Sequence, residues 1–129
     1  MKRRTAVSRV AAIVLACATA SAAPVARGAP DVRADREIQA LLAFVAGSPC
    51  FFVRGGVEYP GPDARDHLAR KLEVSRPMIG SADAFVDYVA SASSASGEPY
   101  LVRCGGRESR ARDWLREELA RLRRTGRPQ

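Results

Sequence analysis

The segment Cys50-Phe-Phe-Val-Arg-Gly-Gly-Val-Glu-Tyr59 constrains the fold more than any other part of the chain. Two short apolar runs flank the Gly55-Gly56 pair, a pattern typical of a β-hairpin with a two-residue turn. Both turn positions require a positive φ, which glycine adopts at little steric cost. We therefore predict a hairpin in which Arg54 lies opposite Val57.

A third strand is expected far downstream, at Tyr100-Leu-Val-Arg-Cys104. Laid antiparallel to the first strand, it places Cys104 beside Cys50 and Tyr100 beside Arg54. Directly opposed residues of an antiparallel pair have the Cα separation that a disulfide requires. We therefore predict strand order 2-1-3 and a Cys50–Cys104 disulfide, which contributes roughly 4 kcal/mol in the chain-entropy model.

Four helices are predicted around this three-stranded antiparallel sheet, because apolar residues recur at helical spacing in four segments. The sheet carries apolar residues on both faces, so we expect helices to cover both. The result is one α+β domain over residues 34–124, with element order α-β-β-α-α-β-α and no visible internal repeat. The predicted helices run from about Ala34 to Ala46, 62 to 74, Ala82 to Ala92, and Arg110 to Arg123.

The N-terminus has the features of a secretory signal peptide, predicted over residues 1–22. A basic start precedes an apolar run from Val10 to Ala18, which is too short to span a bilayer. The small residues Ala20-Ser-Ala22 then form a cleavage site, with Ala23 and Ala29 as alternative positions. A competing interpretation is a lipoprotein signal in which Cys17 is lipidated.

Export leads to several expectations about the mature chain. Its first residues, 23–33, are rich in Ala, Pro and Gly and are expected to form a disordered lead-in. A periplasmic location favours a disulfide between the two remaining cysteines. Loss of four basic leader residues lowers the formal net charge from +7 to +3, and we expect no nucleic-acid partner.

His67 and Lys71 are the leading candidates for a binding site. His67 is the only histidine, and Lys71 is the only lysine outside the predicted leader. Their i,i+4 spacing places both on one helix face. One interpretation is a site for a small anionic or carbohydrate ligand. The other is a salt-bridge network that fixes the second helix against the sheet. The full candidate cluster is Arg54, Glu58, His67, Lys71, Arg76 and Asp87.

Catalytic and metal motifs are weak by comparison. The serines between Ser91 and Ser96 lie in no nucleophile-elbow or S-x-x-K motif. A small hydrolase using His67 with Glu58, Asp87 or a loop serine remains the enzymatic alternative. With both cysteines paired, one histidine and scattered carboxylates are a poor metal set, so we expect no metal and no cofactor.

The basic C-terminal tail, residues 125–129, follows an amphipathic helix with acidic residues in its middle. Membrane contact is therefore expected only through this tail or through lipidation at Cys17. A solvated helix is the alternative interpretation.

Five spaced motifs stand out in the chain: Phe52-x-Arg54-Gly-Gly-x-Glu58-Tyr59, His67-Leu68-x-x-Lys71-Leu72, Arg76, Ser81-Ala-x-x-Phe85-x-Asp87 and Ala90-Ser-x-Ser-Ser-x-Ser96-Gly-x-Pro-Tyr100. They occur in the order found in the YfeK-like family of small periplasmic bacterial proteins, which this chain resembles from about Ile38 to Val102. That resemblance implies export, one small domain and no assigned activity. The chain departs from the family pattern at the turn, where Asn-Gly is often found in place of Gly55-Gly56. The predicted disulfide rests on the strand register and not on this resemblance. We therefore expect a non-catalytic binding or interaction module of the envelope, with the hydrolase as the alternative.

Overall fold

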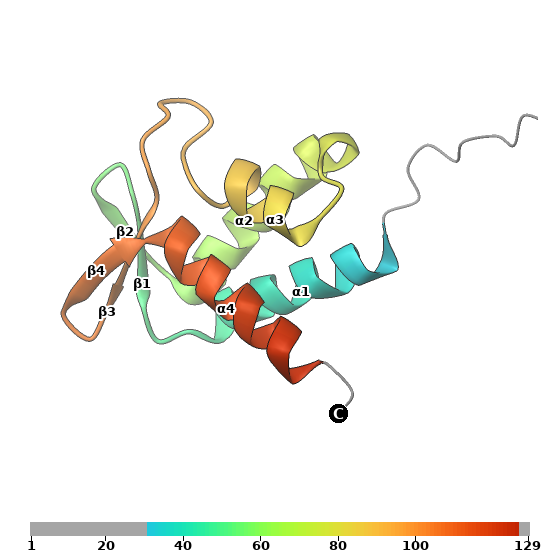
Figure 1. The fold of residues 1–129 in the computed structure, drawn as a ribbon. Coiled ribbons are helices and arrows are strands. Elements are labelled where there is room, and N and C mark those ends of the chain that lie inside the picture. The colour runs from blue at the N-terminus through green and yellow to red at the C-terminus, as the bar shows by residue number, and fades with distance from the viewer. Residues whose placement is uncertain (1–30, 127–129) are drawn as a thin grey trace, which may run out of the picture.

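The computed structural model describes residues 31–126, which form an α+β domain (Figure 1). The predicted signal peptide and most of the predicted lead-in lie outside the described residues, as do residues 127–129 of the tail. The first helix begins at Val32, two residues before the predicted domain boundary, because the Asp31 side chain caps it by accepting from the Arg33 amide. No helix within residues 31–126 is long and apolar enough to cross a membrane.

The sheet confirms the predicted hairpin, register and strand order, and adds a fourth strand. Its order is β2-β1-β3-β4, and every neighbouring pair is antiparallel. The extra strand follows a second Gly-Gly turn and was missed because all four of its residues are exposed and polar. An apolar alternation, the usual evidence for a strand, is therefore absent there. The strands are β1 (Phe51–Arg54), β2 (Val57–Pro60), β3 (Leu101–Cys104) and β4 (Arg107–Arg110).

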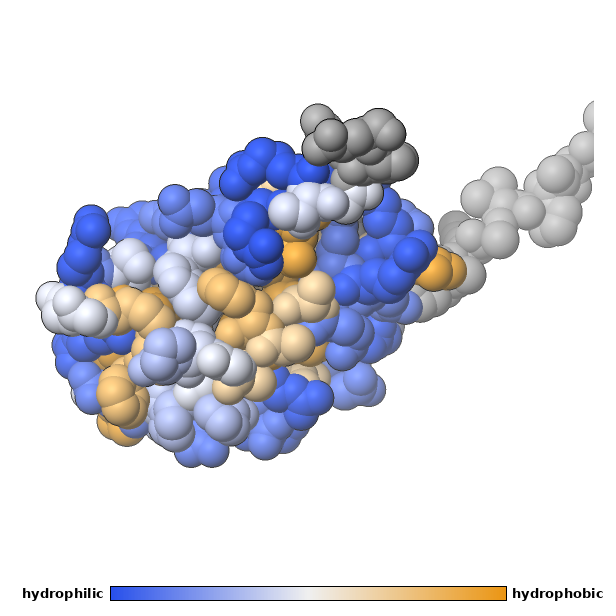
Figure 2. Space-filling model, turned by 90° about the horizontal axis from the view of Figure 1, so that it is seen from below, coloured by the Kyte–Doolittle hydropathy of each residue, from blue (hydrophilic) through white to orange (hydrophobic). Residues whose placement is uncertain are grey.

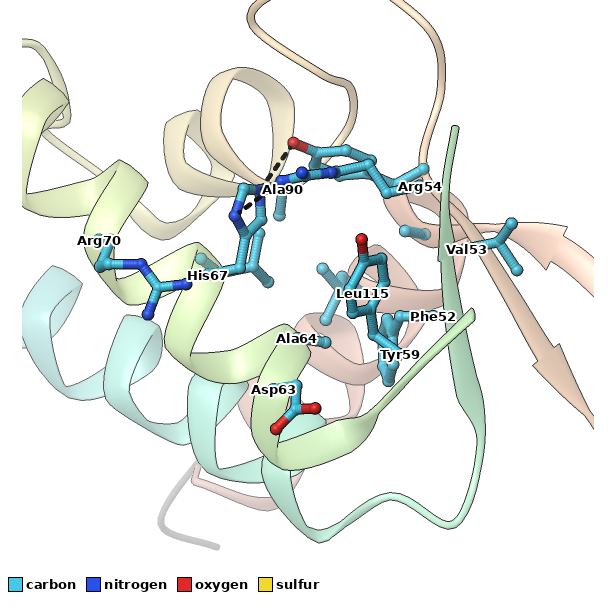
Figure 3. A pocket seen from close by; sticks show the side chains of 13 residues that line it. Phe52, Val53, Arg54, Tyr59, Asp63, Ala64, His67, Arg70, Ala90 and Leu115 are labelled. Carbon is cyan, nitrogen blue, oxygen red and sulfur yellow. Dashed lines mark hydrogen bonds between the residues drawn. The ribbon is translucent and has the colours of Figure 1, made fainter. Parts of the chain in front are cut away.

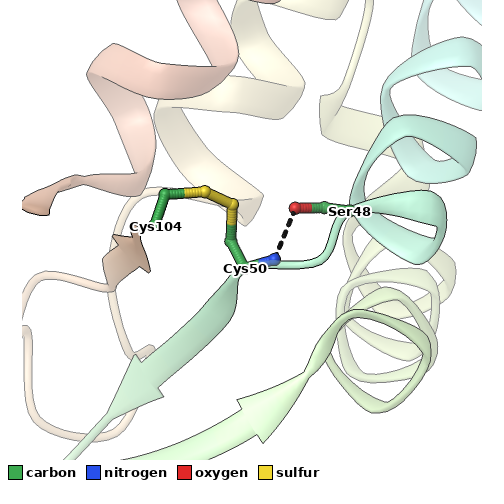
Figure 4. The surroundings of a disulfide bond; sticks show 3 residues. All are labelled: Ser48, Cys50 and Cys104. Carbon is green, nitrogen blue, oxygen red and sulfur yellow. Dashed lines mark hydrogen bonds between the residues drawn. A yellow bond between two sulfur atoms is a disulfide. The ribbon is translucent and has the colours of Figure 1, made fainter. Parts of the chain in front are cut away.

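The predicted disulfide is confirmed (Figure 4). Cys50 lies just before β1 and Cys104 ends β3, and their Cα atoms are 4.6 Å apart. The Cys50 amide donates to Ser48 Oγ at 3.1 Å, which holds the segment between the first helix and β1. The disulfide thus joins the two central strands at one end of the sheet.

Three of the four predicted helices are regular, and the third is not. Ser81 caps it as expected, but only Ala82–Ala84 (α3) is α-helical before a π-helical turn over Phe85–Val89 (η2). The serine-rich segment does not continue the helix, and Ser91 Oγ donates back to the Asp87 carbonyl. The remaining helices are α1 (Val32–Gly47), α2 (Gly61–Ser75) and α4 (Ala111–Thr125), with a short 3₁₀ turn, η1, at Arg76–Met78.

Helices cover one face of the sheet, which corrects the expectation that both faces are covered (Figure 1). Phe52 and Val102 on the covered face are buried in the core. On the open face Arg103 of β3 pairs with Glu58 of β2, across β1, and with Glu108 of β4, and Phe51 is 48% exposed. This face of the sheet is therefore covered by charged cross-strand pairs and not by helices.

Seen from the side of α1 and α4, the surface is not uniformly polar (Figure 2). Apolar residues reach the surface there among hydrophilic ones. Phe44 and Trp114 are stacked, with ring centroids 4.4 Å apart, and both are only partly buried. This aromatic pair borders the disulfide in a hollow of about 380 Å³.

The described chain contains two units with the same order of elements, a repeat that the sequence did not reveal. The first unit is α1, β1, β2 and α2, and the second is α3 with η2, β3, β4 and α4. Each strand of the second unit, and the helix that follows its strands, begins 50 positions after its counterpart in the first. The N-caps Asp31 and Ser81 have the same spacing. At the centre of the sheet Phe52 pairs with Val102, and these two residues are each other's counterparts. The topology therefore has an approximate two-fold axis at this pair.

Candidate functional site

Arg54, His67 and Tyr100 meet at the end of the sheet opposite the disulfide (Figure 3). Arg54 ends β1, His67 lies on α2, and Tyr100 immediately precedes β3. An Arg54 guanidinium nitrogen lies 3.1 Å from His67 Nδ1, and His67 Nε2 lies 3.1 Å from the Tyr100 hydroxyl. The β1–β3 register brings Arg54 and Tyr100 together, and α2, the helix that follows β2, supplies His67.

Lys71 joins this group one helical turn after His67. Its ammonium donates to the Ala92 carbonyl at 2.7 Å and to the Tyr100 hydroxyl at 3.2 Å. It also lies 4.9 Å from the centroid of the Tyr100 ring. The lysine is therefore held in place by two acceptors and an aromatic face.

Burial controls the protonation of this cluster. Burial lowers the pKa of His67 below its usual value, and the nearby charges of Arg54 and Lys71 lower it further. Burial likewise lowers the pKa of Lys71 and raises the pKa of Tyr100. At neutral pH the histidine is therefore neutral, and the tyrosine hydroxyl keeps its proton.

One tautomer of His67 leaves a donor free for a ligand. The same Arg54 nitrogen lies 3.1 Å from Nδ1 and 3.3 Å from Nε2, so both tautomers fit this contact. In the tautomer that carries its proton on Nε2, Nε2–H donates to the Tyr100 oxygen. Lys71 donates to the same oxygen, so both of its lone pairs are occupied. The hydroxyl proton of Tyr100 is then available to an external acceptor.

Arg54, His67 and Tyr100 border a cavity of about 230 Å³, which we call the Arg54 pocket (Figure 3). The Tyr59 hydroxyl points into the space beneath Arg54, while Asp63 lies at the far end. Arg54 also lies 5.8 Å from the centroid of the Tyr59 ring. The cavity therefore combines a basic, hydrogen-bonding rim with apolar walls. Those walls are Phe52, Ala64, Leu68, Ala90, Ala111 and Leu115.

The repeat explains why a cavity is present at this end of the sheet. In the two-unit arrangement, the Arg54 and Tyr100 positions correspond to those of Cys104 and Cys50. At the disulfide end Trp114 stacks on Phe44 and fills the space beside the sheet. At the opposite end the counterpart of Trp114 is Ala64, which leaves that space open. A small residue in place of an indole creates the pocket.

The structure brings together three of the six predicted site residues: Arg54, His67 and Lys71. Glu58 lies on the open sheet face and bonds Arg103. The other two residues also bond elsewhere. Arg76 pairs with Asp35 of α1, and Asp87 pairs with Arg112 and Arg116 of α4.

Two site residues, Tyr59 and Tyr100, were missed as ligand contacts. The register predicted from sequence already placed Tyr100 beside Arg54, so side-chain alternation along the strands was enough to predict that these two residues are neighbours. Tyrosine, however, is common in strands for packing reasons alone. Its role becomes apparent only when α2 places His67 and Lys71 against its hydroxyl.

No carboxylate within residues 31–126 forms an ion pair with Arg54, His67 or Lys71. The cluster is therefore basic and uncompensated, unlike the predicted salt-bridge network. In the same part of the chain, no group of three or more His, Cys, Asp or Glu side chains is arranged to hold a metal ion.

Comparison with known proteins agrees with the resemblance noted in the sequence. The chain is 39% identical over 67 residues to the uncharacterized protein YfeK of Salmonella typhimurium, an alignment that covers 51% of this chain. It covers 56% of the length of that distant homologue. No solved structure matches the chain. A family model described as "Family of unknown function (DUF5329)" matches residues 32–123, which include every helix and strand described above except the last residues of α4. The chain therefore belongs to the DUF5329 family, a family of unknown function.

Proposed function

We propose that this protein is a non-catalytic binding module of the bacterial cell envelope, and that its Arg54 pocket binds a ligand through an anionic group. One observation carries this proposal. His67 and Lys71 contact one tyrosine hydroxyl and Arg54 contacts His67, with no carboxylate of the described chain paired to any of the three. They lie beside a cavity with apolar walls, which Asp63 lines only at its far end. Uncompensated positive charge next to a cavity favours an anion.

Each member of the cluster has a distinct role in this proposal. The exposed guanidinium of Arg54 offers a planar pair of donors that matches a carboxylate, sulfonate or phosphate. Tyr100 donates its free hydroxyl proton to the same anion. Lys71 is held by Ala92 and Tyr100 and contributes its charge at a fixed position.

The pattern of contacts favours binding over hydrolysis. The carboxylates named for the hydrolase alternative, Glu58 and Asp87, pair with arginines away from His67. The hydroxyl that contacts His67 belongs to Tyr100, whose raised pKa makes it a poor nucleophile. A hydrolase would need an activated nucleophile beside this histidine.

The proposed location is the periplasm. The support is the signal-peptide pattern of residues 1–22 together with a disulfide, which persists in oxidising compartments. We propose an envelope ligand or protein as the partner. Membrane contact would involve the basic C-terminus or a lipidated Cys17.

Titration with a small sulfonate, followed by NMR, tests the proposal. Butanesulfonate should shift the resonances of His67 and Tyr100, and Arg54→Gln should weaken its binding about tenfold. Arg107→Gln removes another exposed arginine, on β4, and should leave binding unchanged. If no anion binds, while His67→Ala and Lys71→Ala each lower the melting temperature sharply, the cluster is structural and the proposal fails.

A further inference from the structure

A second cavity of about 820 Å³ continues from the Arg54 pocket along α2. The two cavities share His67 and Arg70 in their walls. We call the second cavity the Met78 groove. It runs from these shared residues and Lys71 to Val74, about 10 Å from His67 at the rise of an α-helix, and on to Met78 in η1. One continuous binding surface can therefore be traced along one side of α2.

The far end of the Met78 groove is unusually apolar for a surface. Val74, Met78 and Tyr88 are 87%, 76% and 75% exposed, and together they are half of the six large exposed hydrophobic residues in the described chain. Ile79, which is buried, also lines the groove. Scattered exposed apolar residues need no explanation, but several in one groove mark a binding surface.

Charge is distributed unequally along the groove. Arg70 and Lys71 lie at the end shared with the Arg54 pocket, and neither forms an ion pair with any residue of the 31–126 segment. The end at Val74 and Met78 is lined by apolar side chains. The groove is therefore positive at one end and apolar at the other.

We infer that the ligand is a single-chain anionic amphiphile, with its head group at the Arg54–Lys71 cluster and its hydrocarbon chain in the Met78 groove. The inference rests on the proposed function for the position of the head group. A chain lying over Val74, Met78 and Tyr88 buries apolar surface that is otherwise exposed to water. The charge gradient of the groove matches the polarity of such a molecule from head to tail.

The same groove suits a polypeptide less well. An extended peptide brings amide groups that need hydrogen-bond partners when they are buried. Ser75 is one of two serines lining the groove, and its hydroxyl already donates to the Lys71 carbonyl. A hydrocarbon chain needs no such partners.

A series of alkyl sulfonates of increasing length, used below their micellar concentrations, tests this inference by NMR titration. Affinity for the wild-type chain should rise from butanesulfonate to octanesulfonate to decanesulfonate, by about two- to fourfold per methylene. Val74→Ser and Met78→Ser, which remove apolar surface without adding charge, should flatten this dependence and leave butanesulfonate binding within about threefold of wild type. Phe51→Ser, on the open sheet face, is the matched control and should retain the full dependence.

The outcomes separate the two proposals. Equal affinity for all chain lengths, with Arg54→Gln still weakening every sulfonate, overturns the amphiphile and preserves the anion site. A length dependence unaffected by Val74→Ser and Met78→Ser places the chain elsewhere and overturns the groove assignment. An acidic apolar peptide that binds where decanesulfonate does not also overturns it, in favour of a peptide site. Failure of every sulfonate to bind the wild-type protein, or sulfonate binding that Arg54→Gln does not weaken, refutes the proposed function itself.

Discussion

Ala64 on α2 and Trp114 on α4 occupy the same position in the two repeated units, and they differ by an entire indole ring. Trp114 packs against Phe44 at 4.4 Å and against Phe52 at 5.4 Å between ring centroids. Ala64 forms part of the wall of the Arg54 pocket. The indole of Trp114 therefore occupies a position whose counterpart at the other end of the sheet borders the Arg54 pocket.

Ala64→Trp is therefore expected to fill the Arg54 pocket. The new ring would occupy the cavity of about 230 Å³, so butanesulfonate affinity should fall at least about tenfold. The melting temperature should stay within a few degrees of wild type, because the ring enters existing space. Isothermal titration and circular dichroism measure the two quantities.

Trp114→Ala is the matched variant at the other end. It should destabilise the fold by about 2–4 kcal/mol and leave anion affinity unchanged. Undiminished sulfonate binding by a folded Ala64→Trp protein would show that the anion lies outside the pocket.

Removing the disulfide should cost about 3–4 kcal/mol of unfolding free energy. The bond closes a long loop between Cys50 and Cys104, 54 positions apart, and so restricts the unfolded chain. Urea denaturation of Cys50→Ala/Cys104→Ala should match that of wild type with reductant. Ser48→Ala, which removes only the neighbouring hydrogen bond, should cost about 1 kcal/mol. A loss below about 1 kcal/mol in the double variant would contradict this account.

Anion affinity should rise as the pH falls into the range in which His67 takes up a proton. The folded protein lowers the pKa of His67 below its ordinary value of about 6.5. A bound anion stabilises the imidazolium, so binding takes up a proton and strengthens as that proton becomes available. Calorimetry with butanesulfonate, whose charge does not change with pH, should show about a tenfold gain between pH 7.5 and pH 5.

Without ligand the same pKa shift acts on stability in the opposite direction. A lowered folded-state pKa stabilises the protein above about pH 6.5, and this contribution is lost as the pH falls and the histidine is protonated. His67→Gln should remove both effects. A pH dependence of affinity that persists in this variant would assign it to another group.

Arg123 on α4 should contribute to stability chiefly above pH 4. Its guanidinium bonds Glu37 of α1 at 2.9 Å and Asp83 of α3 at 2.7 Å, and these hydrogen bonds lower the pKa of both carboxyl groups. Carboxyl groups with lowered pKa values stabilise the fold above their unfolded pKa of about 4, and the effect is lost as the pH falls. Arg123→Gln should therefore cost about 1–2 kcal/mol at pH 7 and progressively less toward pH 2.

Urea denaturation at several pH values checks this expectation. Arg124→Gln, which alters the adjacent exposed arginine, should behave like wild type throughout. An Arg123→Gln deficit that stays constant down to pH 2 would mean that packing, rather than the ion pairs, accounts for the loss.

Several features of the fold were predictable from sequence because they depend on local backbone geometry. Gly55 and Gly56 adopt φ values of 57° and 77°, as the two-residue turn requires. That turn sets the hairpin register, and alternation along two strands then places Cys50 beside Cys104. The helical spacing of apolar residues likewise located α1, α2 and α4 to within a few positions.

The partners of the charged residues could not be predicted in the same way. Arginine and glutamate have long side chains, and most surface ion pairs are only weakly stabilising, so little in the sequence selects one pair over another. Glu58 and Asp87 accordingly pair with arginines from distant segments and not with His67. The fourth strand was missed for a related reason, since exposed polar residues carry no periodic pattern.

From the sequence alone, one could determine a disulfide-linked α+β domain and place Arg54 beside Tyr100 on adjacent strands. Only the tertiary structure decided that α2 brings His67 and Lys71 to that tyrosine hydroxyl, and that the neighbouring space stays open. The physical reason is that strand register follows from side-chain alternation and a two-residue turn, whereas a cavity depends on how distant side chains fill a shared volume. At one end of the sheet Trp114 fills that volume, and at the other end Ala64 does not.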